Sequence, residues 1–159
     1  MIIIRPFKSE DIKAVNIIFD EIDAMHRSSR PDFFKSAEEP FRTAEYYARF
    51  GTEKDELFVG DLNGEIVGFC EIAIRSTGTV PIMVPRTIGF VDTLAVTGRC
   101  RQSGVGAALM EQAEAWSRSK GATAVDFMVW DFNENAIGFY EHRGYSTIMR
   151  RMTKPLNKI

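Results

Sequence analysis

The dipeptide Asn63-Gly64 constrains the fold of this chain more than any other feature. Both residue types tolerate the positive φ angles of a type I′ turn, and runs rich in apolar residues lie on either side of it, at residues 57–62 and 65–75. We therefore expect two antiparallel strands joined by a tight turn. This hairpin is the first fixed point of the predicted sheet.

Helical periodicity dominates the sequence before the hairpin. Residues 2–7 predict a short strand, and Ser9 is the expected N-cap of a helix with acidic residues in its first turn. An apolar stripe at helical spacing follows, formed by Ile12, Val15, Phe19 and Ile22. Residues 28–40 are expected to be a loop, and residues 41–50 a second, amphipathic helix.

The C-terminal half alternates strands with helical crossovers. The expected elements are a loop at 76–85, strands at 87–96, 122–130 and 145–153, and helices from near Gly104 to Gly121 and over 133–142. The fold class is α/β in the broad sense (α+β). We expect a single domain over residues 1–159, with a mixed, mostly antiparallel sheet flanked by helices.

Composition excludes several classes of protein. The net charge is −2 and no Lys/Arg-rich run is present, which argues against nucleic-acid binding. No apolar run approaches the roughly 20 residues of a membrane span, and the one at the N-terminus is too short for a signal peptide. Cys70, Cys100, His26 and His142 lack the spacing of metal ligands. We expect a cytoplasmic protein with reduced thiols and no metal.

Residues 91–109 carry the most information about chemistry. A strand leads through a glycine-containing turn into a helix whose start includes Gly104 and Gly106. The first turn of a helix has N–H groups without intrahelical partners and the positive end of the dipole. Glycines let a phosphate approach the backbone, and Arg101 adds positive charge. The segment predicts an anion site; the alternative is a helix start whose glycines only allow packing on the sheet.

Two other phosphate-binding loops can be tested by spacing. The Walker pattern is absent. The dinucleotide fingerprint Gly-x-Gly-x-x-Gly is met at Gly104 and Gly106, but Leu109 occupies the third glycine position and Asp126 lies within a strand. A dinucleotide-binding protein is therefore kept as an alternative hypothesis, which predicts NAD binding.

Two motifs resemble those of the GCN5-related N-acetyltransferases. The acetyl-CoA loop of that family reads Arg/Gln-x-x-Gly-x-Gly/Ala and follows a Leu-Ala-Val-like strand end, as do residues 101–106 after residues 94–96. The second family motif is matched here by Asn133, Ala136, Phe139, Tyr140, Gly144 and Tyr145. The resemblance covers nearly the whole chain and is weakest before Leu57.

The resemblance implies roles for individual residues. The backbone of residues 94–96 would pair with the pantetheine arm, N–H groups of residues 102–106 would bind the pyrophosphate, and Tyr140 would protonate the leaving thiolate. The implied cofactor-binding residues are Leu94, Ala95, Val96, Arg101, Gln102, Ser103, Gly104, Val105, Gly106, Asn133 and Tyr140.

The general base is left open. Asp92 precedes the Leu-Ala-Val run, and Glu71 is a lone carboxylate in an apolar strand; a half-buried carboxylate with a raised pKa suits proton abstraction. Each of them could also be a structural acid. Glu21 and His26 lie near the end of the first helix that often shapes the acceptor pocket in this family.

The resulting hypothesis is an acetyl-CoA-dependent N-acetyltransferase that moves the acetyl group directly to a primary amine. The alternative is an inactive acyl-CoA-binding sensor or interaction module. The sequence does not identify the acceptor, so a small amine, an amino acid, an antibiotic and a protein N-terminus stay open, and so does a homodimer.

Overall fold

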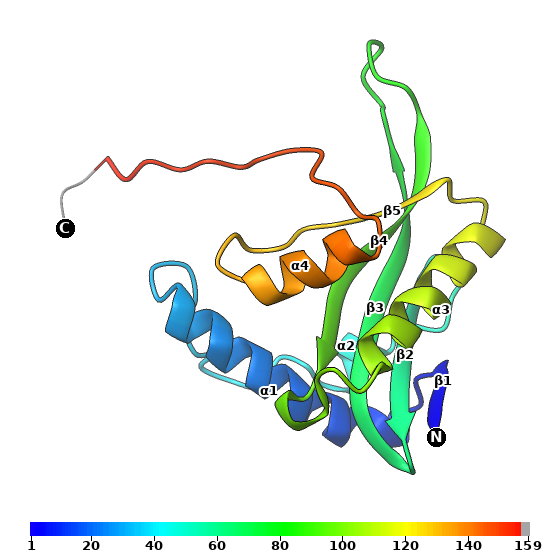
Figure 1. Ribbon diagram of the computed structural model, residues 1–159, viewed down its shortest axis with the longest axis vertical. Coiled ribbons are helices and arrows are strands. Elements are labelled where there is room, and N and C mark those ends of the chain that lie inside the picture. The colour runs from blue at the N-terminus through cyan, green and yellow to red at the C-terminus, as the bar shows by residue number, and fades with distance from the viewer. Residues whose placement is uncertain (157–159) are drawn as a thin grey trace. The chain divides into compact units, whose positions relative to one another are not determined.

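A computed structural model describes residues 1–156 (Figure 1). The chain divides into two compact units, residues 1–128 and residues 129–159. The first unit contains the sheet, and the described part of the second, residues 129–156, contains one helix. That residues 1–159 act as one domain stays a prediction.

The sheet has five strands in the order β1-β2-β3-β4-β5. The strands are β1 (Ile2–Pro6), β2 (Asp55–Leu62), β3 (Glu65–Thr77), β4 (Arg86–Val96) and β5 (Ala124–Phe127). Neighbours are antiparallel except for β4 and β5, which are parallel. The predicted hairpin is β2–β3, and Asn63 and Gly64 have the positive φ angles, 58° and 90°, that its turn requires. The expected mixed, mostly antiparallel sheet is confirmed.

Two helices cover opposite faces of this sheet. Val15 and Phe19 of α1 (Ile12–Ser29) belong to a buried cluster with Leu57 and Val59 of β2. The other face receives α3 (Val105–Ser119), whose Trp116 meets Phe58 edge-on at 6.4 Å between ring centroids. Because neighbouring residues of a strand point to opposite faces, the alternation along β2 separates the two layers.

The beginning of α1 differs from the expectation. Ser9 does not cap it; residues Ser9–Asp11 form a short 3₁₀ turn, and Asp11 is the N-cap. The side chain of Asp11 accepts hydrogen bonds from Arg5, at 2.7 and 2.8 Å, and from the backbone N–H of Lys8 at 2.8 Å. Asp11 therefore serves the turn and the first strand rather than the helix start.

The second helix is shorter than the expected span of residues 41–50. Only α2 (Ala44–Tyr47) is helical. Arg42 is fixed ahead of it, since its guanidinium pairs with Asp23 of α1 at 2.6 Å and its carbonyl accepts from Asn16 at 3.1 Å. These tertiary contacts hold the segment in a conformation that the amphipathic pattern does not reveal.

The fourth strand contains an irregularity next to a candidate site residue. Glu71 is opposite Thr93 and Ile72 is opposite Val91, so Asp92 has no partner of its own on β3. This β-bulge changes which residues of β4 face each layer. On the other side, β5 pairs with β4 only from Ile88 to Val91, which makes β5 shorter than the expected strand over residues 122–130.

The second unit contains α4 (Glu134–His142), close to the expected helix over residues 133–142. Asn133 is its N-cap, and the side chain of Asn133 accepts a hydrogen bond from Ala136 N at 3.3 Å. The predicted last strand over residues 145–153 is wrong: these described residues have no regular secondary structure. Apolar and β-branched residues favour a strand but do not supply a ladder partner.

Candidate functional site

The donor loop, residues 97–106, leads from the end of β4 into the first two residues of α3. Residues Gly98–Cys100 form a 3₁₀ turn, and the backbone then reverses through Gln102 and Gly104, whose φ angles are 65° and 90°. The side chains of residues 101–104 are exposed. The first intrahelical bond runs from Ala108 N to Gly104 O, so N–H groups of the preceding turn have no acceptor within the helix.

Val105 anchors the start of α3 to the sheet. This residue is fully buried. A Cβ atom added to Gly60 would lie 2.6 Å from Val105 Cγ1, and one added to Gly68 would lie 3.1 Å from it. Gly60 of β2 and Gly68 of β3 are register partners. Two glycines side by side on neighbouring strands therefore create the space into which the helix start fits, and this contact sets the position of the donor loop.

The end of β4 offers an open backbone edge. Pairing with β5 stops at Val91. In the part of the chain that the structure describes, residues 92–96 therefore have β3 as a neighbour but no β5 partner. Leu94, Ala95 and Val96 lie on this stretch. An open strand edge beside a loop rich in N–H groups fits an extended amide-containing chain that ends in phosphates.

Glu71 is buried in a polar cluster on the α1 face of the sheet. It is 1% exposed, and its Oε1 accepts a hydrogen bond from the Tyr46 hydroxyl at 2.5 Å. Arg49 lies 3.5 Å from the same oxygen. Burial and the bond to Glu71 raise the pKa of Tyr46, so the phenol stays the proton donor of this pair.

Asp92 is more accessible than Glu71. Its side chain is 32% exposed, and Arg75 donates to its Oδ1 at 2.6 Å while lying 4.0 Å over the Phe90 ring. Since Asp92 is the unpaired residue of the bulge, the backbone bends where this carboxylate is presented. The sheet thus places Glu71 and Asp92 on neighbouring strands, but each has a cationic partner.

Asn133 and Tyr140 belong to the second unit. Asn133 caps α4, as described above, and Tyr140 lies on the same helix. The Tyr140 ring is partly buried, edge-on to Phe139 and Tyr145 at centroid distances of 5.2 and 5.9 Å. These ring contacts within the unit are enough to explain why the aromatic residues occur together. The proposed role of Tyr140 as an acid depends instead on its hydroxyl group.

Sequence reasoning missed the partners of the candidate acids. Tyr46, Arg49 and Arg75 become neighbours of Glu71 or Asp92 only through the fold, and no local motif marks them. His26, which the sequence placed near the acceptor end, stacks on Phe34 at 4.9 Å, and burial lowers its pKa.

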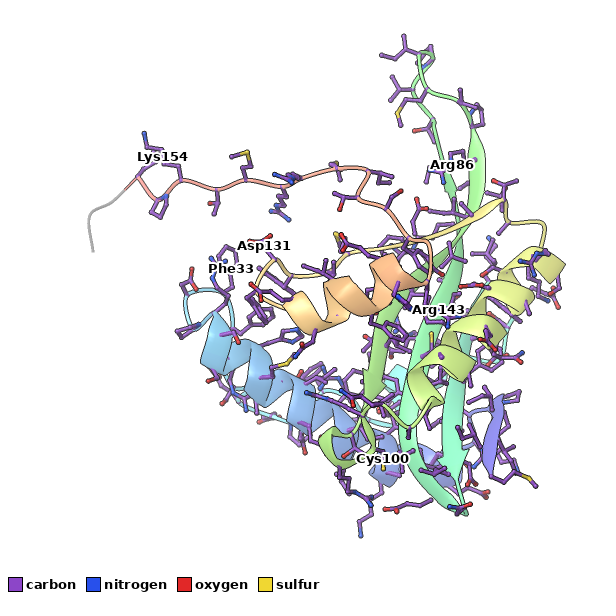
Figure 2. All side chains as sticks on the ribbon, in the orientation of Figure 1. Phe33, Arg86, Cys100, Asp131, Arg143 and Lys154 are labelled. Carbon is purple, nitrogen blue, oxygen red and sulfur yellow. The ribbon has the colours of Figure 1, made fainter. Side chains whose placement is uncertain are left out.

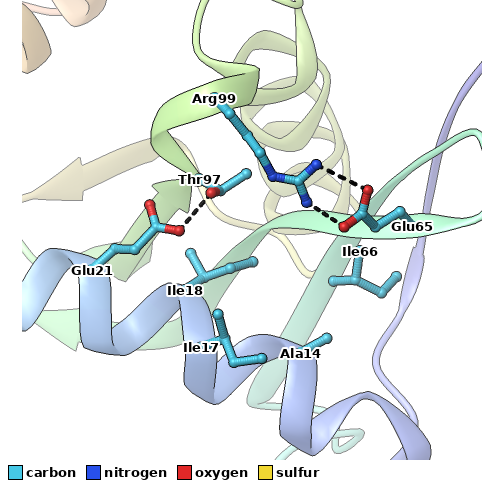
Figure 3. A pocket seen from close by; sticks show the side chains of 8 residues that line it. All are labelled: Ala14, Ile17, Ile18, Glu21, Glu65, Ile66, Thr97 and Arg99. Carbon is cyan, nitrogen blue, oxygen red and sulfur yellow. Dashed lines mark hydrogen bonds and ion pairs between the residues drawn. The ribbon is translucent and has the colours of Figure 1, made fainter.

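A small hollow lies where α1 meets the beginning of β3 and the donor loop (Figure 3). Its volume is about 160 Å³, and apolar side chains of α1 and Ile66 form part of the lining. Polar residues line the rest: Glu21 contacts Thr97, and Arg99 forms an ion pair with Glu65.

Residues 1–156 contain no group of three or more His, Cys, Asp or Glu side chains that could hold a metal ion. In the same part of the chain, no helix is long and apolar enough to cross a membrane. Cys70 is completely buried, and burial raises its pKa, whereas Cys100 is partly exposed on the turn after β4 (Figure 2).

Known proteins share this architecture. The BH1408 protein of Bacillus halodurans, solved as a tetramutant, is 26% identical with a TM-score of 0.89, and the match covers 97% of this chain and 99% of that one. The aminoglycoside acetyltransferase meta-AAC0020 from a soil metagenomic sample, in complex with sisomicin, is 15% identical with a TM-score of 0.70, covering 98% and 97%. AAC(6′)-Iy, in complex with a CoA bisubstrate analogue, is 16% identical with a TM-score of 0.70, covering 99% of each chain. No curated protein matches.

The fold of this chain is thus shared with these solved structures. A family model described as the acetyltransferase (GNAT) family matches residues 22–145. Because this match spans most of the chain, the chain belongs to the GNAT family and is an N-acetyltransferase. The family uses acetyl-CoA as its donor.

Proposed function

We propose that this protein moves an acetyl group from acetyl-CoA directly to a primary amine. The observation that carries the proposal is the open edge of β4 followed by the donor loop, with φ angles of 65° at Gln102 and 90° at Gly104. Residues 94–96 would hold the pantetheine arm by backbone hydrogen bonds. N–H groups of residues 102–106 would bind the pyrophosphate, with Arg101 adding charge and Asn133 contacting the cofactor arm.

Three hydrogen-bearing groups take part in the proposed reaction: the acceptor amine, a backbone N–H near Val96 and the Tyr140 hydroxyl. An alkyl ammonium has a pKa near 10.4, so the acceptor must lose a proton before its nitrogen attacks the thioester carbon. A backbone N–H near Val96 would stabilise the carbonyl oxygen while the C–N bond forms. The C–S bond then breaks as the attacking nitrogen loses its second proton to the base or to water, and the Tyr140 hydroxyl would protonate the leaving sulfur.

Asp92 and Glu71 are the proposed bases, and their surroundings favour Asp92 as the one that an acceptor amine can reach. Glu71 is nearly inaccessible and already accepts from Tyr46 and Arg49. Asp92 is partly exposed and has one partner, Arg75. An acceptor amine would reach Asp92 more readily, whereas Glu71 would act only through Tyr46 or water. Asp92→Asn should therefore reduce turnover more than Glu71→Gln, provided that both variants are folded.

The same ion pairs support a second candidate function. If Arg75 and Arg49 keep both carboxylates engaged, the protein would bind acyl-CoA without turnover and act as a sensor or interaction module.

A cytoplasmic location, one domain over residues 1–159 and a homodimer remain part of the proposal. One structural neighbour, meta-AAC0020, is an aminoglycoside acetyltransferase, so aminoglycosides belong among the amines tested.

Ligand-dependent stability separates these functions. Acetyl-CoA or CoA at about 100 times the dissociation constant should stabilise the folded state by about 2.7 kcal/mol. For a chain of this size that gain raises Tm by roughly 5–10 °C. NAD should cause no shift. No response to saturating CoA would reject the proposal, and binding without turnover across a panel of amines, read by free-thiol release, would favour the sensor.

Tyr140→Phe tests the proposed acid. The substitution keeps the ring that packs on Phe139 and Tyr145, so CoA binding should be almost unchanged. Turnover should fall by about 10²–10⁴, in kcat as well as kcat/KM. Turnover within about threefold of the parent, well short of that range, would exclude Tyr140 as an essential acid.

A further inference from the structure

Glu21 connects the first helix to the donor loop. It lies on α1, and its two carboxylate oxygens accept from different groups of the loop: Thr97 Oγ1 donates to Oε1 at 2.5 Å, and Gly98 N donates to Oε2 at 2.9 Å. Figure 3 shows the carboxylate beside Thr97 at the edge of the hollow. These residues are far apart in the sequence, so the contact is tertiary.

Both sides of this contact are anchored. Thr97 is 6% exposed; its N–H donates to Val67 O at 2.8 Å, and its carbonyl accepts from Cys100 N at 3.0 Å. On the helix, Ile18 and Phe19 are each 2% exposed and belong to the core cluster. A carboxylate held between two fixed elements transmits the position of one to the other.

The charge of Glu21 strengthens the contact. Hydrogen bonds from Thr97 and Gly98 lower the pKa of Glu21, so the side chain is ionised at neutral pH. Hydrogen bonds to an ionised acceptor are shorter and roughly twice as strong as neutral ones. Arg99 and Arg101 contribute further positive potential, although the Arg99 guanidinium itself pairs with Glu65.

We propose that Glu21 is a positioning residue that holds the donor loop in its binding conformation. Thr97 and Gly98 begin the loop that leads to the N–H groups of residues 102–106, so their displacement would move these phosphate-binding groups. The inference rests on the proposed function, because it takes acetyl-CoA to be the ligand of this loop. It also links the helix near the acceptor side to the donor side of the site.

Five variants test the proposal by calorimetric titration with CoA. Glu21→Gln and Thr97→Val each remove a bond to the loop and should weaken CoA binding by about tenfold. Thr97→Ser keeps the hydroxyl and should bind CoA like the parent. Glu10→Gln, which neutralises an exposed carboxylate paired with Lys8, should also leave the dissociation constant unchanged. The double variant Glu21→Gln/Thr97→Val should be little weaker than either single variant.

The outcomes separate this inference from the proposed function. If the parent protein does not bind CoA, the proposed function fails. If the parent binds CoA and folded Glu21→Gln and Thr97→Val bind it equally well, with only a lower Tm, Glu21 is merely structural and the inference is overturned. If Glu21→Gln does not fold, the comparison of Thr97→Val with Thr97→Ser decides the question.

Discussion

Gly60→Ala should destabilise the protein because its methyl group enters space that Val105 occupies. The new Cβ would lie 2.6 Å from Val105 Cγ1, well short of the roughly 3.5–4.0 Å at which carbon atoms pack. Val105 cannot turn aside easily, since a β-branched residue in a helix has one strongly preferred rotamer and this one is fully buried. Overpacking of this kind costs about 1–3 kcal/mol, or roughly 2–12 °C in Tm.

A second substitution turns this expectation into a test of the contact. Val105→Ala alone should cost at least about 1.6 kcal/mol, because it removes two buried carbon groups, and the cavity left behind adds to that cost. In Gly60→Ala/Val105→Ala, the methyl group at residue 60 occupies the vacated space. The double variant should therefore be at least as stable as Val105→Ala alone, which corresponds to a coupling of about 1–3 kcal/mol.

Urea unfolding followed by circular dichroism measures the free energies of unfolding of the parent protein, the two single variants and the double variant. Gly138→Ala is the matched control: it makes the same substitution in a helix where a Cβ has no atom within 4 Å, and should be neutral or stabilising. Strict additivity, within about 0.5 kcal/mol, would refute the argument that Gly60 is glycine to admit Val105.

Gly104→Val and Gly121→Val place valine at φ angles of 90° and 81° at opposite ends of α3, so both should lose at least about 1–2 kcal/mol of stability. Only Gly104→Val should also weaken CoA binding, by about tenfold or more, and unchanged affinity in calorimetry would contradict the donor-loop assignment. Burial alone would raise the pKa of Asp11, but hydrogen bonds from Arg5 and the Lys8 backbone outweigh it and leave the pKa below its usual value. A lowered pKa contributes stability above the unfolded pKa that is lost as the pH falls through the folded one, so Asp11→Asn should cost about 1.5–3 kcal/mol at pH 7 and progressively less below about pH 4. A difference in unfolding free energy that stayed constant down to pH 3 would contradict this assignment.

Local signals in the sequence predicted the hairpin, β4 and α3, because turn chemistry, apolar periodicity and helix-end glycines act over a few residues. Features that depend on distant partners were not predictable in this way. The bulge at Asp92 depends on its register with Glu71 and Ile72, which no run of apolar residues encodes. The shortened α2 depends on the contacts of Arg42 with α1.

The same distinction between local signals and distant partners applies to the candidate site. Residues 101–106 were recognisable because phosphate binding uses backbone N–H groups, which leave a local glycine signature. The surroundings of the candidate bases were not, since Tyr46, Arg49 and Arg75 are ordinary residues until the fold brings them to Glu71 and Asp92.

The unequal burial of the two cysteines gives the chain a native labelling position. Thiol-reactive dyes modify the thiolate form, and Cys70 is both inaccessible and held protonated by its buried surroundings. Cys100 is partly exposed and is followed directly by Arg101, the first residue of the donor motif. A maleimide fluorophore should therefore attach at Cys100 without any engineered cysteine, and its emission would follow changes in the donor loop in real time.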